Sequence, residues 1–154
     1  MNHPLIEALE KAGVTVVLMP PDNVKLQPGP SIAPQEVILP LVKEAKRRKP
    51  EILETLRRQE FNRLYALVRA SMSRVAEIYI EGGIEEAKRQ GMWPKILCLE
   101  HSIDQALVDL DKARLLGALE ALERAWQEVT DKTAQRRRQN PLASKPQPDP
   151  LASM

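Results

Sequence analysis

The sequence from Leu5 to Met19, LIEALEKAGVTVVLM, changes its hydrophobic pattern at Gly13. Before the glycine, apolar residues recur at spacings of three and four, which is typical of one face of a helix. After the glycine, Val14–Met19 is rich in β-branched residues, which favour a strand. Glycine commonly ends a helix. The stretch therefore predicts a helix over His3–Ala12 followed directly by a strand.

A second short run, Val24–Gln27, follows a turn at Pro20–Asn23, so the two runs predict a β-hairpin. Pro20 and Pro21 in this turn have no N–H to donate to a ladder hydrogen bond, so the strands must end at the turn. Alternation along the strands divides the side chains between two faces. The residues expected to face the helices are Val14, Val16, Leu18, Val24 and Leu26; those expected to face outward are Thr15, Val17, Met19, Lys25 and Gln27. A two-stranded hairpin leaves both outer edges unpaired.

A third segment, Pro34–Arg58, completes a predicted helix–hairpin–helix–helix module over residues 1–58. Pro34 and Pro50 suit the first turns of two helices. Pro40 either marks the start of the regular helix or kinks it, since an internal proline removes a hydrogen bond.

The remainder predicts a helical bundle over residues 59–136 and a disordered tail over residues 137–154, so the expected fold class is α+β and mostly helical. The expected helices are Pro50–Ile80, Ile84–Gln90, Pro94–Val108 and Asp111–Arg136. After Pro50, the first of these runs through the module boundary without Gly or Pro. The tail repeats the string Pro-Leu-Ala-Ser at 141–144 and 150–153, which is either a binding motif or chance.

The composition is that of a globular protein, and its single cysteine is compatible with a reducing cytoplasm. The chain has 154 residues, of which 43% are hydrophobic and 29% charged, with a net charge of +2. The charge is too small to require an acidic partner for the whole molecule. The single Cys98 forms no internal disulfide, and no apolar run approaches a membrane span. Without a basic leader before the first apolar run, we expect a cytoplasmic protein.

Residues that could carry chemistry are few. His3 is expected in a frayed terminus. His101 follows Glu100 directly and lies three residues before Asp104 on one helical face, but one helix supplies too few ligands for a metal site. Cys98 is expected to be a buried apolar cysteine. No phosphate-binding loop or nucleophile motif is present. The sequence therefore predicts no catalytic residue, metal or cofactor, and a protein that is not an enzyme.

One stretch has a local positive charge that could contact nucleic acid. Its cations are Lys43, Lys46, Arg47, Arg48, Lys49, Arg57, Arg58 and Arg63. Four glutamates are interleaved with them, which also suits ion pairs on a solvated helix face. Phe61 and Tyr65, the aromatic residues nearby, fit the core stripe. Trp93 and Trp126 are expected to pack in the bundle.

Residues 3–58 resemble the TubC N-terminal docking domain family, small modules at the N-termini of megasynthase subunits and other bacterial proteins. The likeness is carried by LIEALEKAGV at 5–14, the strands and turn up to Pro28, and KPEILETLR at 49–57. The resemblance implies an αββαα fold, often homodimeric, whose second strand, here Val24–Gln27, receives a peptide from a partner chain. Lys25 is the cation of that strand, and cations around it imply an acidic partner.

We therefore expect a docking or adaptor protein that forms a homodimer and adds a partner peptide to its hairpin by strand addition. The residues expected to bind the partner are Val17, Met19, Val24, Lys25, Leu26 and Gln27. If the N–H of Lys25 faces the partner, proline there removes a binding donor. The alternative is a small nucleic-acid-associated accessory protein, such as one from a phage or mobile element, that uses residues 43–63.

Overall fold

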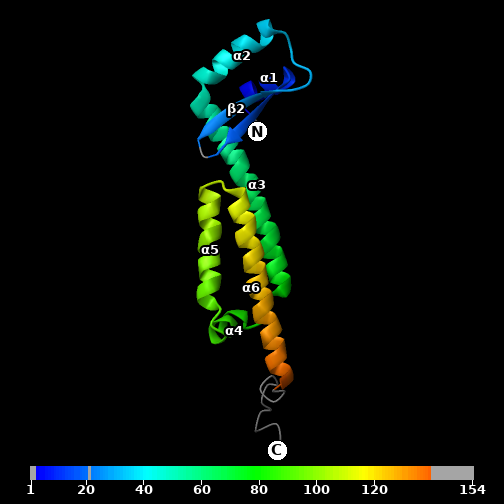
Figure 1. Cartoon of the computed structure of the whole chain (residues 1–154), viewed down its shortest axis with the longest axis vertical. Helices are drawn as coiled ribbons and strands as arrows, with labels where there is room; N and C mark the ends of the chain where they lie inside the picture. The colour runs from blue at the N-terminus through cyan, green and yellow to red at the C-terminus, as the bar shows by residue number, and fades with distance from the viewer. Residues whose placement is uncertain (1–2, 21, 140–154) are drawn as a thin grey trace, which may run out of the picture.

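A computed structural model describes residues 3–20 and 22–139 and shows the expected mostly helical α+β class (Figure 1). Its elements in order are α1 (Pro4–Lys11), β1 (Val14–Met19), β2 (Asn23–Pro28), α2 (Gln35–Arg47), α3 (Lys49–Ile78), α4 (Gly83–Arg89), α5 (Trp93–Val108) and α6 (Lys112–Gln139). The strands form an antiparallel pair in which Val14 lies opposite Pro28 and Met19 opposite Asn23. Pro21 and the predicted tail from residue 140, with both Pro-Leu-Ala-Ser strings, lie outside the described residues; residues 137–139, assigned to the tail from sequence, belong to α6.

The first hydrophobic cluster lies under the hairpin and defines the module. Its buried members are Leu5, Ile6, Leu9, Val14, Val16, Ala45, Ile52 and Leu56. Leu18, Val24 and Leu26 are partly buried against it. The alternation predicted for both strands is therefore confirmed: one face of the hairpin covers α1 and the start of α3, and the other is largely exposed.

His3 holds the beginning of α1 and is not frayed as its position near the chain end suggested. Its Nδ1 accepts a hydrogen bond from the N–H of Leu5 at 3.1 Å, and its Nε2 lies 3.3 Å from a carboxylate oxygen of Glu51. An accepting Nδ1 requires the proton of a neutral ring to be on Nε2. One imidazole thus caps α1 and ties it to the first turn of α3.

Gly13 is required by the connection from α1 to β1. Its φ is +88°, and an added Cβ would lie 2.1 Å from the carbonyl oxygen of Ser31. The same glycine accepts a hydrogen bond from the N–H of Gly29 at 2.8 Å. The chain after β2 therefore passes so close to Gly13 that no side chain fits there.

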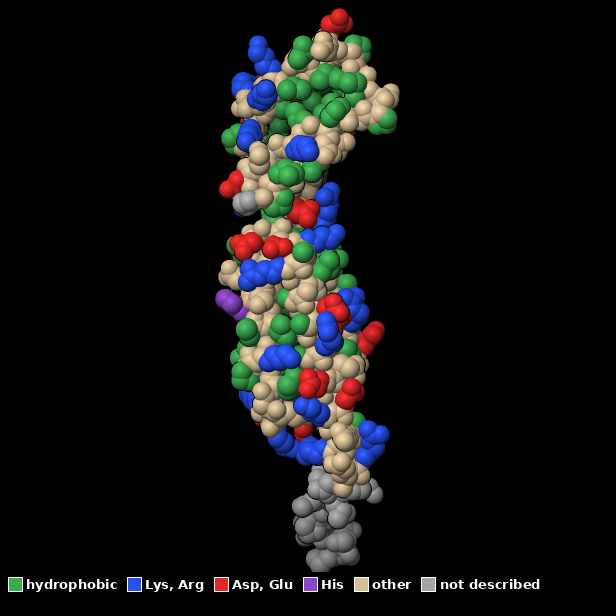
Figure 2. All heavy atoms as spheres, in the orientation of Figure 1, with side chains coloured by type: hydrophobic (Ala, Val, Ile, Leu, Met, Phe, Trp, Pro, Cys, Tyr) green, Lys and Arg blue, Asp and Glu red, His purple; other side chains and the backbone are tan. Residues whose placement is uncertain are grey.

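Pro40 lies inside α2, so the helix begins before it, after Pro34 at the N-cap. The helix is only lightly buried, because Ala45 is its single buried residue in the described structure. Val37 and Leu39 are 50% and 60% exposed, and Ile32 just before the helix is 53% exposed. The module therefore keeps an uncovered apolar surface, and Figure 2 shows hydrophobic side chains gathered on this part of the molecule.

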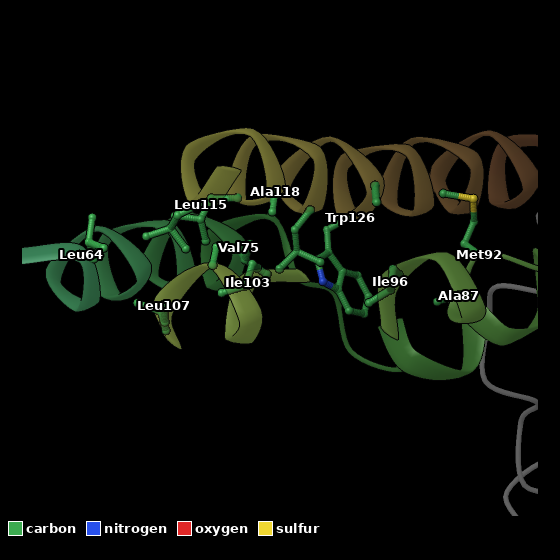
Figure 3. Close-up of a cluster of buried hydrophobic side chains, with 14 of the residues drawn as sticks. Leu64, Val75, Ala87, Met92, Ile96, Ile103, Leu107, Leu115, Ala118 and Trp126 are labelled. Carbon is green, nitrogen blue, oxygen red and sulfur yellow. The ribbon is translucent and has the colours of Figure 1, made fainter. Parts of the chain in front are cut away.

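The second cluster lies among α3, α5 and α6, with α4 at their far end (Figure 1). Trp126 of α6 is buried and extends toward Ile96 of α5, as Figure 3 shows. The ring of Tyr79 meets it edge-on at 5.6 Å between centroids. Trp93 is partly buried against the same cluster. Both tryptophans pack in the bundle, as expected.

Helix α3 joins the two clusters. Over 30 residues it extends about 45 Å. Its first turns contribute Ile52 and Leu56 to the module cluster, and its later turns contribute Leu64 and Val75 to the bundle cluster. The result is an elongated molecule with the hairpin at one end of a three-helix layer (Figure 1).

The Gly13 turn gives a stability prediction. Gly13→Ala forces a side chain into left-handed backbone and against the Ser31 carbonyl, so we expect a loss of about 2–3 kcal/mol in unfolding free energy. Gly117→Ala is the matched control, because an added Cβ at this position in the second turn of α6 meets nothing within 4 Å. It should stabilise the chain by about 0.5–1 kcal/mol. Urea unfolding of both variants measures the difference, and equal effects would contradict the assigned turn.

Candidate functional site

The hydrogen-bond pattern of the hairpin determines which backbone groups face its edges. Opposite residues of an antiparallel pair alternate between pairs that exchange hydrogen bonds and pairs that do not. The N–H of Gly29 donates to the carbonyl of Gly13, one position beyond the Val14–Pro28 pair. Counting from there, Val17 and Lys25 form a hydrogen-bonded pair, and Val16 and Leu26 do not. The N–H of Lys25 therefore faces β1, and the condition for using it as a partner-binding donor is not met.

The outer edge of β2 offers few donors. Its outward-facing positions are Val24, Leu26 and Pro28, which follow from the same alternation. The N–H of Val24 already donates to the Oδ1 atom of Asn23 at 2.9 Å. Proline has no N–H to donate. In the described strand, Leu26 is left as the one outward donor.

The outer edge of β1 borders a groove of about 1120 Å³. The groove is lined by Thr15, Val16, Val17 and Leu18 of β1, by α1, by one side of α3 and by the turn between α5 and α6. The lining residues of α3 are Leu56, Arg57, Gln59, Glu60 and Arg63. Successive strand residues point to opposite faces. Four consecutive residues of β1 line the groove, so it must border the edge of the strand and not one of its faces. No described residue of β2 lines the groove.

The turn between α5 and α6 forms the far wall of the groove. Leu110 is buried at 6% exposure and has φ +53°, the single positive φ among described residues other than glycine. Asp111 follows it and caps α6, because its Oδ1 accepts the N–H of Arg114 at 3.1 Å. The two residues hold this turn in a defined position, with Val108 67% exposed beside it.

The six predicted partner-binding residues do not share one surface. Met19, Lys25 and Gln27 are exposed and Val17 is half-buried, all on the outer face of the hairpin. Val24 and Leu26 are turned toward the module cluster. Of the six, only Val17 lines the groove. The sequence did not predict the groove. Pro28 was nevertheless a signal of the ladder pattern, because a proline in a strand belongs at a position whose N–H would face away from the neighbouring strand.

The eight predicted nucleic-acid-binding cations lie on α2, on α3 and, for Arg48, at the junction between them, and many are paired with carboxylates. Arg47 pairs with Glu44, Arg48 with Glu51 at 2.6 Å, Arg57 with Asp22 at 3.3 Å, Arg58 with Glu54 at 3.0 Å and Arg63 with Glu60 at 3.4 Å. Lys49 donates to Asn23 at 3.4 Å, while Lys43 and Lys46 are both exposed on α2. The hydrogen bond from Arg47 lowers the pKa of Glu44, and those from Arg48 and His3 lower the pKa of Glu51. These carboxylates therefore stay ionised and keep competing with a phosphate for the arginines.

Phe61 and Tyr65 are exposed, which contradicts their predicted place in the core. They are 41% and 42% exposed, and their rings stack with centroids 6.1 Å apart. The guanidinium of Arg69 lies 5.1 Å from the centre of the Tyr65 ring. The aromatic pair and its cation form one surface on α3 next to the basic segment.

Cys98 is also exposed, not buried as predicted, and so is His101 on the same helix. In the described part of the chain, no three His, Cys, Asp or Glu side chains are grouped closely enough to hold a metal ion. None of the helices described combines the length and the apolar character needed to cross a membrane. Comparison of the chain with family models, curated proteins and solved structures gives no match.

The assignment of the ladder can be checked by stability. Lys25→Pro removes a donor that pairs with β1, so we expect a loss of about 2–3 kcal/mol in unfolding free energy. Lys25→Ala keeps the N–H and should change the unfolding free energy by less than about 0.5 kcal/mol, because the side chain is exposed. Urea titration measures both variants. A harmless Lys25→Pro would mean that this N–H faces the edge after all.

Proposed function

We propose that the chain is a non-enzymatic docking protein that receives an extended segment of another polypeptide as an added strand on its hairpin. The single observation that supports this proposal is a two-stranded sheet with outward backbone groups and no third strand in the described structure. Strand addition uses such groups for affinity and neighbouring pockets for specificity. The resemblance of residues 3–58 to TubC-type docking domains points the same way.

Two leucines provide a matched test of strand addition. Leu18 and Leu26 are both half-buried at outward-facing ladder positions, one on each strand. Leu18→Pro or Leu26→Pro removes one edge donor, whereas Leu18→Ala and Leu26→Ala lose the same packing and keep the donor. For a peptide selected on the full chain from a random library, one proline variant should weaken binding about tenfold relative to its alanine partner. Fluorescence anisotropy gives the dissociation constants.

Two results would reject the docking function. One is that no library peptide binds the full chain. The other is that a selected peptide binds both proline variants as tightly as the matching alanine variants. Circular dichroism of each variant verifies that the helices remain, so a loss of binding is not mistaken for unfolding.

The proposal includes a homodimer. Ile32, Val37 and Leu39 are exposed apolar side chains on different sides of the module, and a second copy would cover part of this set. Light scattering should give twice the 17.4 kDa chain mass. The double variant Val37→Lys/Leu39→Lys should give the chain mass, while Leu97→Lys, a change at a 46% exposed leucine of α5, should leave the dimer intact. A single-chain mass for the unaltered protein would exclude the dimer.

A second candidate function is nucleic-acid binding, and the exposed aromatic pair on α3 favours it. Stacking of bases on Phe61 and Tyr65 would add to phosphate contacts from the unpaired lysines of α2. A single-stranded oligonucleotide should then shift in a gel at about 50 mM salt and lose most of its affinity by about 200 mM. Phe61→Ala/Tyr65→Ala should weaken the shift, and Met72→Ala, at a 39% exposed site on the same helix, should not. No shift at low salt would remove this candidate.

A further inference from the structure

We propose that the groove beside β1 binds an extended, positively charged peptide segment, which pairs with the edge of β1. The inference rests on the docking function above and adds two things to it: which edge is used and which charge the partner carries. It places the partner on the strand opposite to the one implied by the family resemblance, and reverses the expected charge.

The geometry of the ladder supports β1. Val16 and Leu18 each direct one N–H and one C=O away from β2, because neither belongs to a hydrogen-bonded pair. Both residues line the groove. No hydrogen bond to another described backbone group engages these N–H groups. An extended chain lying in the groove would therefore meet donors and acceptors at the two-residue spacing of a strand.

The outer edge of β2 is the weaker choice. Its carbonyls are outward-facing, but Val24 donates to Asn23 and Pro28 has no donor. A strand added there would find Leu26 as its one free donor within the described strand. Natural sheets use such local devices to blunt an edge. The hairpin thus has one blunted edge and one edge with consecutive free positions.

The charge of the groove identifies the kind of peptide. The charged residues that line it are Glu10, Asp22, Arg57, Glu60, Arg63, Asp109, Asp111 and Lys112. Five carboxylates face three cations. Arg57 and Arg63 are paired with Asp22 and Glu60 inside the groove. Glu10 has no ion-pair partner among the described residues, and Asp109 is held only by the exposed Arg114 at 3.5 Å.

Apolar side chains also line the groove between the charges. Val17 is half-buried on the β1 side, and Val108 is 67% exposed on the opposite wall. A segment that alternates basic and apolar residues would place cations near the carboxylates and apolar side chains against these valines. The expected ligand is therefore a basic, strand-forming segment of a partner protein.

The test uses two peptides with the same apolar residues and opposite charge, Ac-TKVRIKVT-NH2 and Ac-TEVEIEVT-NH2. On the full chain, the cationic peptide should bind about tenfold more tightly, as expected for a few exposed ion pairs. Leu18→Pro should weaken its binding about tenfold relative to Leu18→Ala, and Leu26→Pro should match Leu26→Ala. By NMR, hydrogen exchange of the Val16 and Leu18 amides should slow when the peptide binds.

Charge reversal provides a second arm. Glu10→Lys/Asp109→Lys should reduce the preference for the cationic peptide about tenfold. Glu77→Lys/Glu81→Lys makes the same change in net charge at exposed sites outside the groove and should leave the preference unchanged. Circular dichroism again confirms that each variant is folded.

Several outcomes would overturn the inference while leaving the docking function in place. One is slowed hydrogen exchange of the Leu26 amide together with loss of peptide binding in Leu26→Pro. Another is that the anionic peptide binds as tightly as the cationic peptide or more tightly. A third is that Glu10→Lys/Asp109→Lys keeps the preference for the cationic peptide. Stronger competition from a synthetic peptide of residues 141–154 than from the cationic peptide would instead assign the groove to the chain's own C-terminal segment. The inference would also be rejected if library peptides bind the chain but neither of the two charged peptides does.

Discussion

Helix α3 packs into two hydrophobic clusters at once, and the groove beside the hairpin depends on this shared helix. Ile52 and Leu56 hold its beginning in the module, and Leu64 begins its contact with the bundle. The intervening turns have no glycine or proline that would interrupt the backbone hydrogen bonds. Leu18 of β1 contacts both clusters. The strand edge and the α5–α6 turn therefore border the same groove along one continuous helix, which lines it with Leu56, Arg57, Gln59, Glu60 and Arg63.

Much of the fold could be predicted from sequence, because the signals are local. The change of pattern at Gly13 marks the boundary between α1 and β1, and prolines or glycines lie near the helix boundaries. The inward-facing set of strand residues follows from alternation alone. His3 was misjudged because a capping histidine looks like any polar residue at a chain end. Only its position opposite Glu51 distinguishes it, and that contact joins residues 48 positions apart.

The errors on α3 and α5 have a different cause. At about 100° per residue, Leu64 lies about 80° around α3 from Leu56, so the buried face turns between the module and the bundle. A single stripe drawn through both ends places Phe61 and Tyr65 in the core, yet they lie beyond the side that α6 covers. The prediction that Cys98 is buried was wrong for the same reason. Apolar neighbours in the sequence do not show which face of α5 is left uncovered by the other helices.

The groove could not be predicted, because segments far apart in the sequence form it and only the packed chain brings them together. It also resolves a difficulty that any open hairpin edge presents, namely unwanted pairing with another sheet. The β2 edge is blunted by Asn23 and Pro28, through local chemistry. The β1 edge keeps its donors, but α1 and the α5–α6 turn stand on either side of it. A single extended chain can lie between such walls, whereas a whole sheet pairing through its edge strand would need room for its further strands, each about 4.8 Å beyond the last, where the α5–α6 turn stands. In the proposed docking function, shelter of this kind would keep one edge open to a partner segment while opposing sheet-to-sheet aggregation.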